Sequence, residues 1–274
     1  MNTEEKYLAL MQEVLNEGIY VENSRTNSEC LTLVNKSMQY GSEFPLLTTR
    51  KMYWKQAICE MLCYMRGYST LAEFHSLGVH TWDANVSAWE HPNNPDKTNA
   101  GIIYGASSKM VGVSYLQLLR NIKANPTDRG HIWNFWNPEY FNEGCLRPCM
   151  MLHQFNVLGD KLYLTSYQRS VDLPLGFSWN LVQTWFLLNV TARLTGYVPA
   201  NILHTMSNVH IYKNQEDLVE EHIKREPFDP PRFVFKKDIT RGDIMVSINK
   251  DNFDEYFGLE DYQYHPPIKY PFTV

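Results

Sequence analysis

The segment SWNLVQTWFLLNVTARLTG, residues 178–196, is the feature that most limits how this chain can fold. It predicts a helix with apolar side chains on nearly every side, with Ser178 as its N-cap and Gly196 just beyond its last turn. Such a helix lacks a polar face and must be buried. A chain of 274 residues, 44% of them hydrophobic, is large enough to surround it. We therefore expect one domain, residues 1–274, built around this helix.

Other periodic segments predict the elements that surround the central helix. Residues 4–17 have the apolar spacing of an amphipathic helix that ends near Gly18, and residues 53–67 predict a second buried helix. Residues 29–40 alternate as a strand does, and residues 153–168 predict a hairpin around a Leu-Gly-Asp turn. Strands in both halves, interleaved with long helices, predict an α+β fold with a mixed or antiparallel sheet covered by helices.

Charge and cysteine content exclude several classes of function. A formal charge of -5 and a pI of about 6.0 give no electrostatic basis for a nucleic-acid substrate. The N-terminus is acidic and amphipathic, unlike a signal peptide, and no apolar stretch is long enough to span a membrane. Five cysteines are an odd number in a chain too large to need disulfides, so we expect a reducing, cytoplasmic setting. A zinc finger needs four ligands, and no histidine pair at finger-like spacing accompanies Cys59 and Cys63 or Cys145 and Cys149, so no metal is expected.

The remaining polar residues form a short list of candidates for chemistry. Cys30, Cys59 and Cys63 are interpreted as buried thiols. Cys149 follows a proline, and on spacing alone it fits a packed thiol, half of a disulfide, a metal ligand or a nucleophile. A nucleophilic cysteine needs positive charge or hydrogen-bond donors nearby. Arg169 follows the predicted hairpin and is a candidate for that charge.

Three further candidates come from local context. Glu60 is the one acid in the buried helix predicted at 53–67, and a buried carboxylate is costly unless it is paired or used. Tyr104 and the pair His210 and Tyr212 also enter the list. Taken singly, His210 and Tyr212 are each more often a hydrogen-bonded core residue than a functional one.

The order of several motifs resembles the thymidylate synthase family almost from end to end. The motifs are EFPLLTTRK (43–51), GVHTWDAN (78–85), IYG (103–105), NPTDR (125–129), RPCMMLHQF (147–155), YQRSVDLPLG (167–176) with Asn180, HIYKNQ (210–215) and HPPIK (265–269). The resemblance implies transfer of a one-carbon unit from 5,10-methylenetetrahydrofolate to C5 of dUMP. It also implies a homodimer with shared active sites, and no membrane or nucleic-acid partner.

In this resemblance, Cys149 adds to C6 of the pyrimidine and makes C5 nucleophilic. Arg169 holds the substrate phosphate and favours the thiolate. Glu60 organises water and proton transfer near O4, and Tyr104 helps to remove the C5 proton. Asn180 bonds N3–H and O4 of uracil, whereas relatives that act on cytosine have aspartate there. The other implied substrate residues are Arg25, Gln168, Ser170, Asp172, His210 and Tyr212, with Arg129 contributed by the partner subunit.

The resemblance also implies where the folate binds. Arg50 stands where the family usually has a lysine near the glutamyl tail. The implied contacts to the pterin and aminobenzoate groups are Trp82, Asp172, Gly176, Trp179 and the terminal Val274.

Several positions differ from the family's usual residues. Gly130 replaces the second arginine of an Arg-Arg pair, Met150 replaces the histidine after the nucleophile, and Ser178-Trp179 replaces Pro-Phe. IYGASSKM lacks the usual Gln-Trp-Arg, RTNSE replaces RTGTG, and Ser207-Asn208 followed by Val209 replaces Gly-Asp. These changes cluster at the folate side and at one edge of the phosphate site.

Altered folate contacts favour the entry of water, which would attack the transferred carbon in place of hydride. The expectation is therefore a dUMP hydroxymethylase that makes 5-hydroxymethyl-dUMP for modified viral DNA. The alternative is a thymidylate synthase that makes dTMP and dihydrofolate, which the presence of Trp82 and Val274 favours. An inactive relative that binds nucleotide or RNA is a more remote alternative, and a cysteine hydrolase is weaker still.

Overall fold

The computed structural model describes residues 1–23, 27–41 and 43–272. The helices are α1 (Thr3–Glu17), α2 (Trp54–Arg66), α3 (Leu71–Ser76), α4 (Asp83–Ala88), α5 (Tyr104–Met110), α6 (Tyr115–Ala124), α7 (Ser178–Thr195), α8 (Glu216–His222) and α9 (Phe253–Tyr256). The strands are β1 (Ile19–Asn23), β2 (Ser28–Tyr40), β3 (Ile132–Asn134), β4 (Met150–Leu158), β5 (Lys161–Gln168), β6 (Val171–Asp172), β7 (Val198–Tyr212), β8 (Arg232–Phe235) and β9 (Phe257–Glu260). Single turns of other helix types are η1 (Pro138–Tyr140), η2 (Leu173–Phe177), η3 (Lys213–Gln215) and η4 (Asp243–Ser247).

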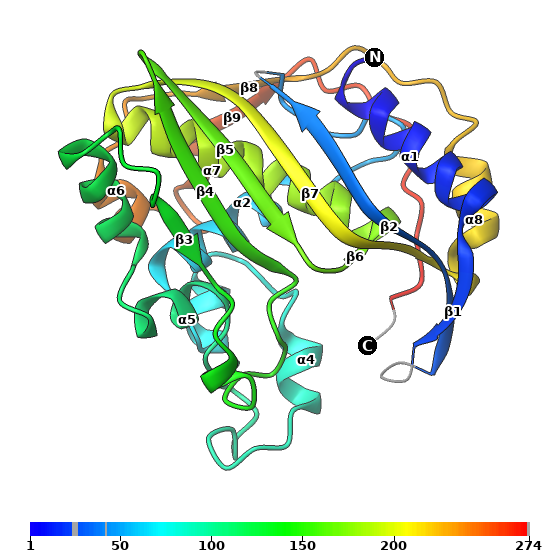
Figure 1. Ribbon diagram of the computed structural model, residues 1–274, viewed down its shortest axis with the longest axis horizontal. Helices are drawn as coiled ribbons and strands as arrows, with labels where there is room; N and C mark the ends of the chain where they lie inside the picture. Colours follow the sequence, from blue (N-terminus) through cyan, green and yellow to red (C-terminus); the bar gives the residue numbers. More distant parts are fainter. Residues whose placement is uncertain (24–26, 42, 273–274) are drawn as a thin grey trace.

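The main sheet has the strand order β1-β2-β7-β5-β4-β3, and β6 pairs with β7 (Figure 1). Most neighbours are antiparallel, whereas β5 and β6 pair with β7 in parallel, so the sheet is mixed. The predicted α+β fold, with a mixed sheet covered by helices, is confirmed. β8 and β9 form a separate two-stranded sheet.

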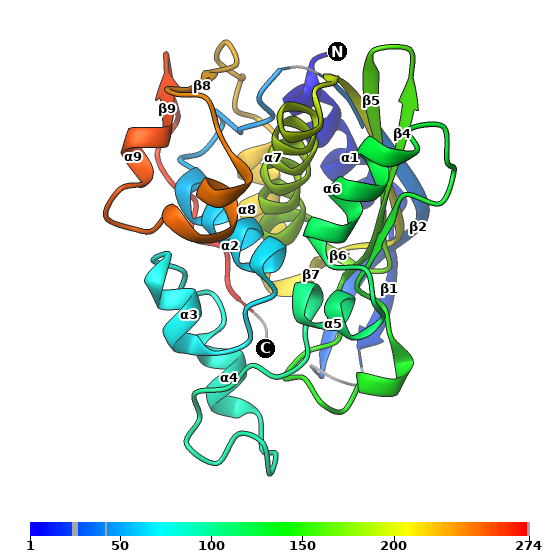
Figure 2. The same cartoon turned by 90° about the vertical axis from the view of Figure 1, so that its left-hand side faces the viewer.

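Helix α7 is the centre of the core, as its composition predicts. It lies between the main sheet and α2 (Figure 2). Nearly all of its side chains are buried, and Gly196 ends it in the left-handed conformation with φ 87°. The predicted N-cap is wrong: Ser178 is already inside the helix because the π turn η2 leads directly into α7. The Ser178 hydroxyl instead donates to the backbone oxygens of Pro174 and Leu175.

The helices that bury the sheet lie on one of its faces. On β5, the side chains of Leu162 and Leu164 point into the core, and the alternating Tyr163, Thr165 and Tyr167 are only partly buried on the other face. Within the described residues, no helix is both long and apolar enough to cross a membrane.

Strand geometry brings distant motifs to one end of the sheet. Met150 at the start of β4 pairs with Gln168 at the end of β5, since these strands are antiparallel. Val171 and Asp172 of β6 pair with Val209 and His210 near the end of β7. The residues just before β4, just after β5 and at the end of β7 therefore meet.

Candidate active site

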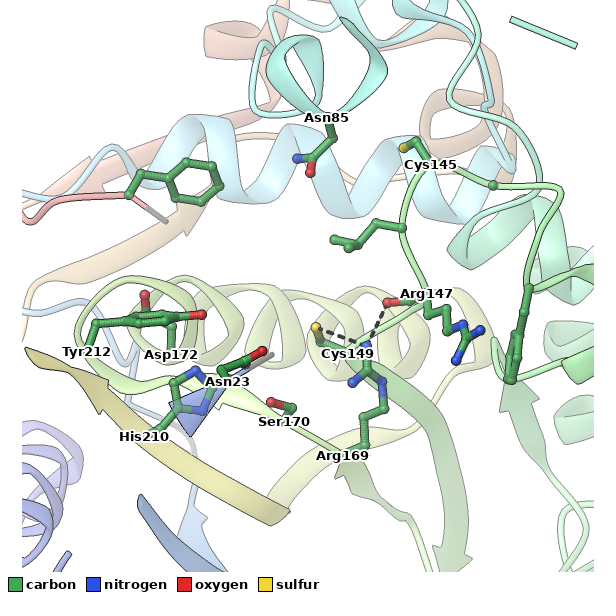
Figure 3. A pocket seen from close by; sticks show the side chains of 14 residues that line it. Asn23, Asn85, Cys145, Arg147, Cys149, Arg169, Ser170, Asp172, His210 and Tyr212 are labelled. Atoms are coloured by element: carbon green, nitrogen blue, oxygen red, sulfur yellow. Dashed lines mark hydrogen bonds between the residues drawn. The ribbon is translucent and has the colours of Figure 1, made fainter. Parts of the chain in front are cut away.

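A cleft of about 530 Å³ lies at this end of the sheet (Figure 3). It is lined by Asn23, Asn85, Phe141, Gly144, Cys145, Leu146, Arg147, Cys149, Arg169, Ser170, Asp172, His210, Tyr212 and Phe272. Six of the residues predicted from the sequence are among them: Cys149, Arg169, Ser170, Asp172, His210 and Tyr212.

Cys149 and Arg169 face each other across the ends of β4 and β5. Arg169 Nη2 lies 3.8 Å from Cys149 Sγ. The guanidinium is held in place because Nε donates to the oxygen of Pro148 at 2.9 Å and Nη2 to that of Arg147 at 3.0 Å. A positive charge fixed beside a sulfur favours its thiolate form. The arrangement suits a nucleophilic cysteine.

Tyr104 contacts the backbone of Cys149. The backbone N–H of Cys149 donates to its hydroxyl at 3.2 Å, and the ring stacks on Tyr64 with centroids 4.3 Å apart. Trp82 packs edge-on against the same ring at 5.7 Å. Burial raises the pKa of Tyr104 well above its usual value, so the hydroxyl stays protonated at neutral pH.

Glu60 is buried and accepts hydrogen bonds from neighbouring side chains. Thr81 donates to Oε1, and Trp179 and Gln183 donate to Oε2 at 2.8 and 2.7 Å. Burial raises the pKa of Glu60 above its usual value although these donors act in the opposite direction. A carboxyl group in this environment is suited to exchanging a proton, as the resemblance implies.

Asn180 is part of a chain of amide hydrogen bonds behind the cleft. Its Nδ2 donates to Gln183 Oε1 at 2.9 Å, and its Oδ1 accepts from Gln168 Nε2 at 2.9 Å. Gln168 Oε1 in turn lies 2.8 Å from His204 Nε2. Asn180 is partly exposed, so part of its amide remains accessible to a ligand.

His210, Tyr212 and Asp172 form the other wall of the cleft. His210 Nδ1 lies 2.8 Å from Asn208 Oδ1, and its ring packs edge-on against that of Tyr212. Asp172 accepts from the Leu175 N–H at 3.0 Å and from Gln215 Nε2 at 3.0 Å. Burial raises the pKa of Asp172 to about 6.

Some predicted residues lie elsewhere. Arg50 is buried, where its Nη2 donates to Pro174 O at 2.7 Å and to Ser178 Oγ at 2.8 Å, and it does not line the cleft. Arg129 is exposed on the loop before β3. Gly176 lies near Asp172, and a Cβ on it would make only ordinary contacts. Arg25 and Val274 lie outside the described residues.

Sequence reasoning missed several residues of this region, among them Arg147, Asn85, Phe272 and Gln183. Arg147 and Asn85 lie inside motifs that carry the family resemblance, and both line the cleft. Phe272 lines it from the C-terminal segment. Gln183 is one helical turn after Asn180, a spacing that places two side chains on one face and is the signal for their contact.

The buried cysteines agree with their interpretation as packed thiols. Cys30, Cys59 and Cys63 are each at most 4% exposed, and all five cysteines of the chain are thiols. Cys145 reaches the cleft, but burial raises its pKa to about 12, which keeps it protonated at neutral pH.

Three relatives show what the whole chain is similar to. It is 42% identical to the thymidylate synthase of Shewanella loihica, 43% to that of Idiomarina loihiensis and 42% to that of Vibrio cholerae. In each case the match covers 98% of this chain and 99% of the relative.

These relatives overturn the expectation of a dUMP hydroxymethylase, because proteins this similar over their full length are named thymidylate synthases. The expected product, 5-hydroxymethyl-dUMP for viral DNA, is therefore wrong. The structure supplies a physical reason. Two of the unusual residues, Met150 and Ser178, are at most 1% exposed and do not line the cleft, so they do not open it to water.

A family model described as thymidylate synthase matches residues 5–274. Members of this family are one-carbon transferases that bind dUMP and use methylenetetrahydrofolate as co-substrate. With a match over nearly all of its length and relatives at 42–43% identity, the chain belongs to the thymidylate synthase family.

Proposed function

We propose that this enzyme converts dUMP to thymidylate with methylenetetrahydrofolate, through a covalent bond between Cys149 Sγ and C6 of uracil. The observation that carries the proposal is the Cys149 sulfur 3.8 Å from the Arg169 guanidinium, inside a cleft also lined by His210 and Tyr212. The relatives named thymidylate synthase support the same reaction.

The first chemical step uses Cys149, Arg169 and Asn180. The thiolate forms a bond to C6, and the electron pair of the C5–C6 double bond moves toward C5 and O4. Arg169 stabilises the thiolate and binds the phosphate of dUMP with Ser170. Asn180 donates to O4, where negative charge develops, and this contact therefore strengthens in the transition state.

The later steps need a proton acceptor and an exit for the thiolate. Methylenetetrahydrofolate supplies the carbon unit and the hydride that completes the methyl group. C5 loses its proton when the new C5–carbon bond is in place, and the bond between that carbon and the folate nitrogen breaks to leave an exocyclic methylene. Hydride adds to this methylene to give the methyl group and dihydrofolate, and the Sγ–C6 bond breaks to return the Cys149 thiolate. The hydrogen bond between the Tyr104 hydroxyl and the Cys149 N–H supports a role for Tyr104 in guiding the C5 proton to solvent.

The described residues suit a folate beside the nucleotide. Asp172 faces the cleft and keeps acceptor positions beyond the two hydrogen bonds that it already accepts, which matches the amino and ring N–H groups of a pterin. Gln215 Nε2 donates both to Asp172 and to Pro271 O at 3.1 Å. This residue therefore ties the C-terminal segment that carries Phe272 to the proposed folate wall.

We also infer that the active form is a homodimer, that residues 1–274 make one catalytic domain and that the enzyme works in a reducing cytoplasm. One continuous hydrophobic core extends from α1 to the C-terminal segment, which supports the single domain. The open face of the main sheet and the exposed Arg129 support the dimer. Cysteines in the thiol form support the compartment.

The reaction is tested by mixing the enzyme with dUMP and methylenetetrahydrofolate. We expect dihydrofolate absorbance to rise in step with the appearance of dTMP, identified by mass. Dihydrofolate without a matching amount of dTMP, or no nucleotide product at all, contradicts the proposal.

A further inference from the structure

Gln183 joins two residues that the proposed reaction uses. It is fully buried in α7, where its Nε2 donates to Glu60 Oε2 at 2.7 Å and its Oε1 accepts from Asn180 Nδ2 at 2.9 Å. An ionised carboxylate only accepts hydrogen bonds. While Glu60 is ionised, Gln183 therefore turns its NH₂ group to Glu60 and its oxygen to Asn180.

A second set of hydrogen bonds imposes the same orientation on the Asn180 amide from its other side. Gln168 Nε2 donates to Asn180 Oδ1, and the oxygen of Gln168 faces His204 Nε2 at 2.8 Å. The Tyr40 hydroxyl lies 3.2 Å from the other ring nitrogen of His204. Two buried chains of hydrogen bonds thus agree on one orientation of the Asn180 amide.

We propose that Gln183 is a positioning residue that locks the Asn180 amide in the orientation that reads uracil. Uracil offers N3–H as donor and O4 as acceptor, whereas cytosine offers the reverse, so a rotated amide would suit cytosine. An amide that cannot rotate forms both hydrogen bonds with uracil. With cytosine bound in the same place, its buried polar groups would be left unpaired. This inference rests on the proposed function and deepens it.

The test is calorimetric binding of dUMP and of dCMP to wild type and to Gln183→Met, which has a similar shape but cannot hold an amide. We expect the preference for dUMP to fall at least tenfold, while alkylation of Cys149 by iodoacetamide keeps its rate. Asn189→Ala is the matched control, since Asn189 is an amide on the same helix whose Nδ2 donates to Trp185 O. An unchanged preference in folded Gln183→Met overturns the inference.

A second variant keeps the inference testable if Gln183→Met does not fold. Gln183→Glu retains an acceptor for Asn180 but places a second carboxyl group against Glu60, and the two buried carboxyl groups must share a proton. We expect it to keep the preference and the KM for dUMP while kcat falls, and loss of the preference would contradict this role. Failure of the proposed function has a different signature, because wild type would then bind dUMP and yield no thymidylate.

A different observation concerns three side chains at the junction of α3 and α4. Nε2 of His75 lies 2.8 Å from Asp83 Oδ1, and Nδ1 of His80 lies 3.1 Å from Asp83 Oδ2. One nitrogen atom of each histidine and one oxygen atom of Asp83 all lie within 4.8 Å of one another. The three side chains are 38–59% exposed, which leaves room for a water molecule beside them.

The geometry assigns to His75, His80 and Asp83 a site for a divalent transition-metal ion. Two imidazoles and one carboxylate, with a solvent molecule as fourth ligand, form a common ligand set for zinc. Gly78, at φ 72°, allows the turn that brings the two helices together. In the sequence, Thr81 lies between His80 and Asp83 and donates a hydrogen bond to Glu60, and Asn85 follows Asp83 and lines the cleft. A bound ion would therefore hold this wall of the cleft in place.

Titration of the nucleotide-free enzyme with Co²⁺ tests this site independently of the reaction. We expect one ion per chain with the visible absorption of nitrogen and oxygen ligands, competition by Zn²⁺, and at least tenfold weaker binding in His80→Ala. His91→Ala is the control, because His91 also lies near a carboxylate, 3.9 Å from that of Glu143. Unchanged binding in His80→Ala, or a thiolate-to-cobalt absorption band, overturns the assignment.

Discussion

Cys149 differs from the other cysteines of this chain in its surroundings rather than in its neighbours along the sequence. Cys59 and Cys63 are packed inside α2, and burial raises the pKa of each thiol. Cys149 instead lies at a strand end beside a guanidinium that backbone oxygens hold in place. Position at the edge of the sheet therefore separates a candidate nucleophile from packing thiols.

Replacing this sulfur tests its role. We expect Cys149→Ser to lower kcat at least about 10³-fold, because a hydroxyl is far less nucleophilic than a thiolate, with dUMP binding nearly unchanged. Initial rates of dTMP formation and calorimetric binding measure the two effects. Cys145 lines the same cleft, and Cys145→Ser should stay active. If Cys145→Ser lost activity and Cys149→Ser kept it, Cys145 would be the nucleophile instead.

Asn180 supports a prediction about the base. We expect Asn180→Asp to lose preference for dUMP and to bind dCMP more tightly than wild type does, because a protonated or water-bridged carboxyl suits cytosine N3 and its amino group. Competition binding with both nucleotides measures the change. If the variant still preferred dUMP by the wild-type ratio, Asn180 would not be the residue that reads the base.

At the scale of elements, the contact between α2 and α5 positions Tyr104. A Cβ on Gly105 would lie 1.6 Å from the backbone oxygen of Tyr64, so glycine is required for α5 to pack this closely. Tyr104 itself has φ 41°, a strained value for a residue with a side chain. Close packing at Gly105 maintains that strain and keeps the Tyr104 hydroxyl on the Cys149 backbone.

We expect Gly105→Ala to reduce the free energy of unfolding by about 3 kcal/mol or more, because overpacking must push the two helices apart. Thymidylate formation should fall with it, since Tyr104 moves. Urea denaturation and initial rates measure both. Gly41→Ala is the control, as its Cβ would lie 3.7 Å from the nearest atom, the oxygen of Ala200; equal urea midpoints for the two variants would contradict the argument.

At the scale of the whole molecule, buried histidines make the fold sensitive to acid. Burial lowers the pKa of His153, His204 and His222 to about 3 in each case. The unfolded chain binds these protons below about pH 6.5, and the folded chain does not until about pH 3. Stability is therefore lost as the pH falls through this window. Asp172, with its raised pKa, acts in the opposite direction between about pH 6 and pH 4.

We expect the free energy of unfolding to decrease from pH 7.5 to pH 5, with each of the three histidines contributing about 2 kcal/mol at pH 5. Urea titrations at several pH values measure the slope. His222→Gln, which offers polar atoms to Thr49 and Tyr270 without titrating, should give a shallower slope. The same slope in wild type and variant would show that His222 does not contribute.

The proposed dimer gives a prediction that involves two chains. We assume that Arg129 of one subunit completes the phosphate site of the other. Dimers made only of Arg129→Ala chains, or only of Cys149→Ser chains, should then be weakly active. When the two kinds of chain are mixed and refolded, mixed dimers form. About a quarter of all sites should then contain both the wild-type Cys149 and the wild-type Arg129 and regain activity. Activity assays and sedimentation measure this outcome. A stable, active monomer would exclude the shared site.

The sequence and the structure agree on some of these elements and not on others. The uniform apolar character of residues 178–196 predicts a buried helix, because burial is a property of each side chain and is visible locally. The cap at Ser178 is wrong because the π turn before it depends on how Leu173–Phe177 pack under β7. The parallel pairing of β5 with β7 joins segments separated by α7, and alternation along one strand carries no record of its partner.

The sequence by itself determined the central helix and the α+β class. Through its motifs it also determined the family and singled out Cys149 and Arg169 as a candidate catalytic pair. These follow from residue types and their order along the chain. Only the tertiary structure decided that Arg50 is buried, that Gln183 links Glu60 to Asn180, and that two histidines and an aspartate meet between α3 and α4. Hydrogen bonds between distant side chains depend on distances of a few ångströms, which only the packed fold defines.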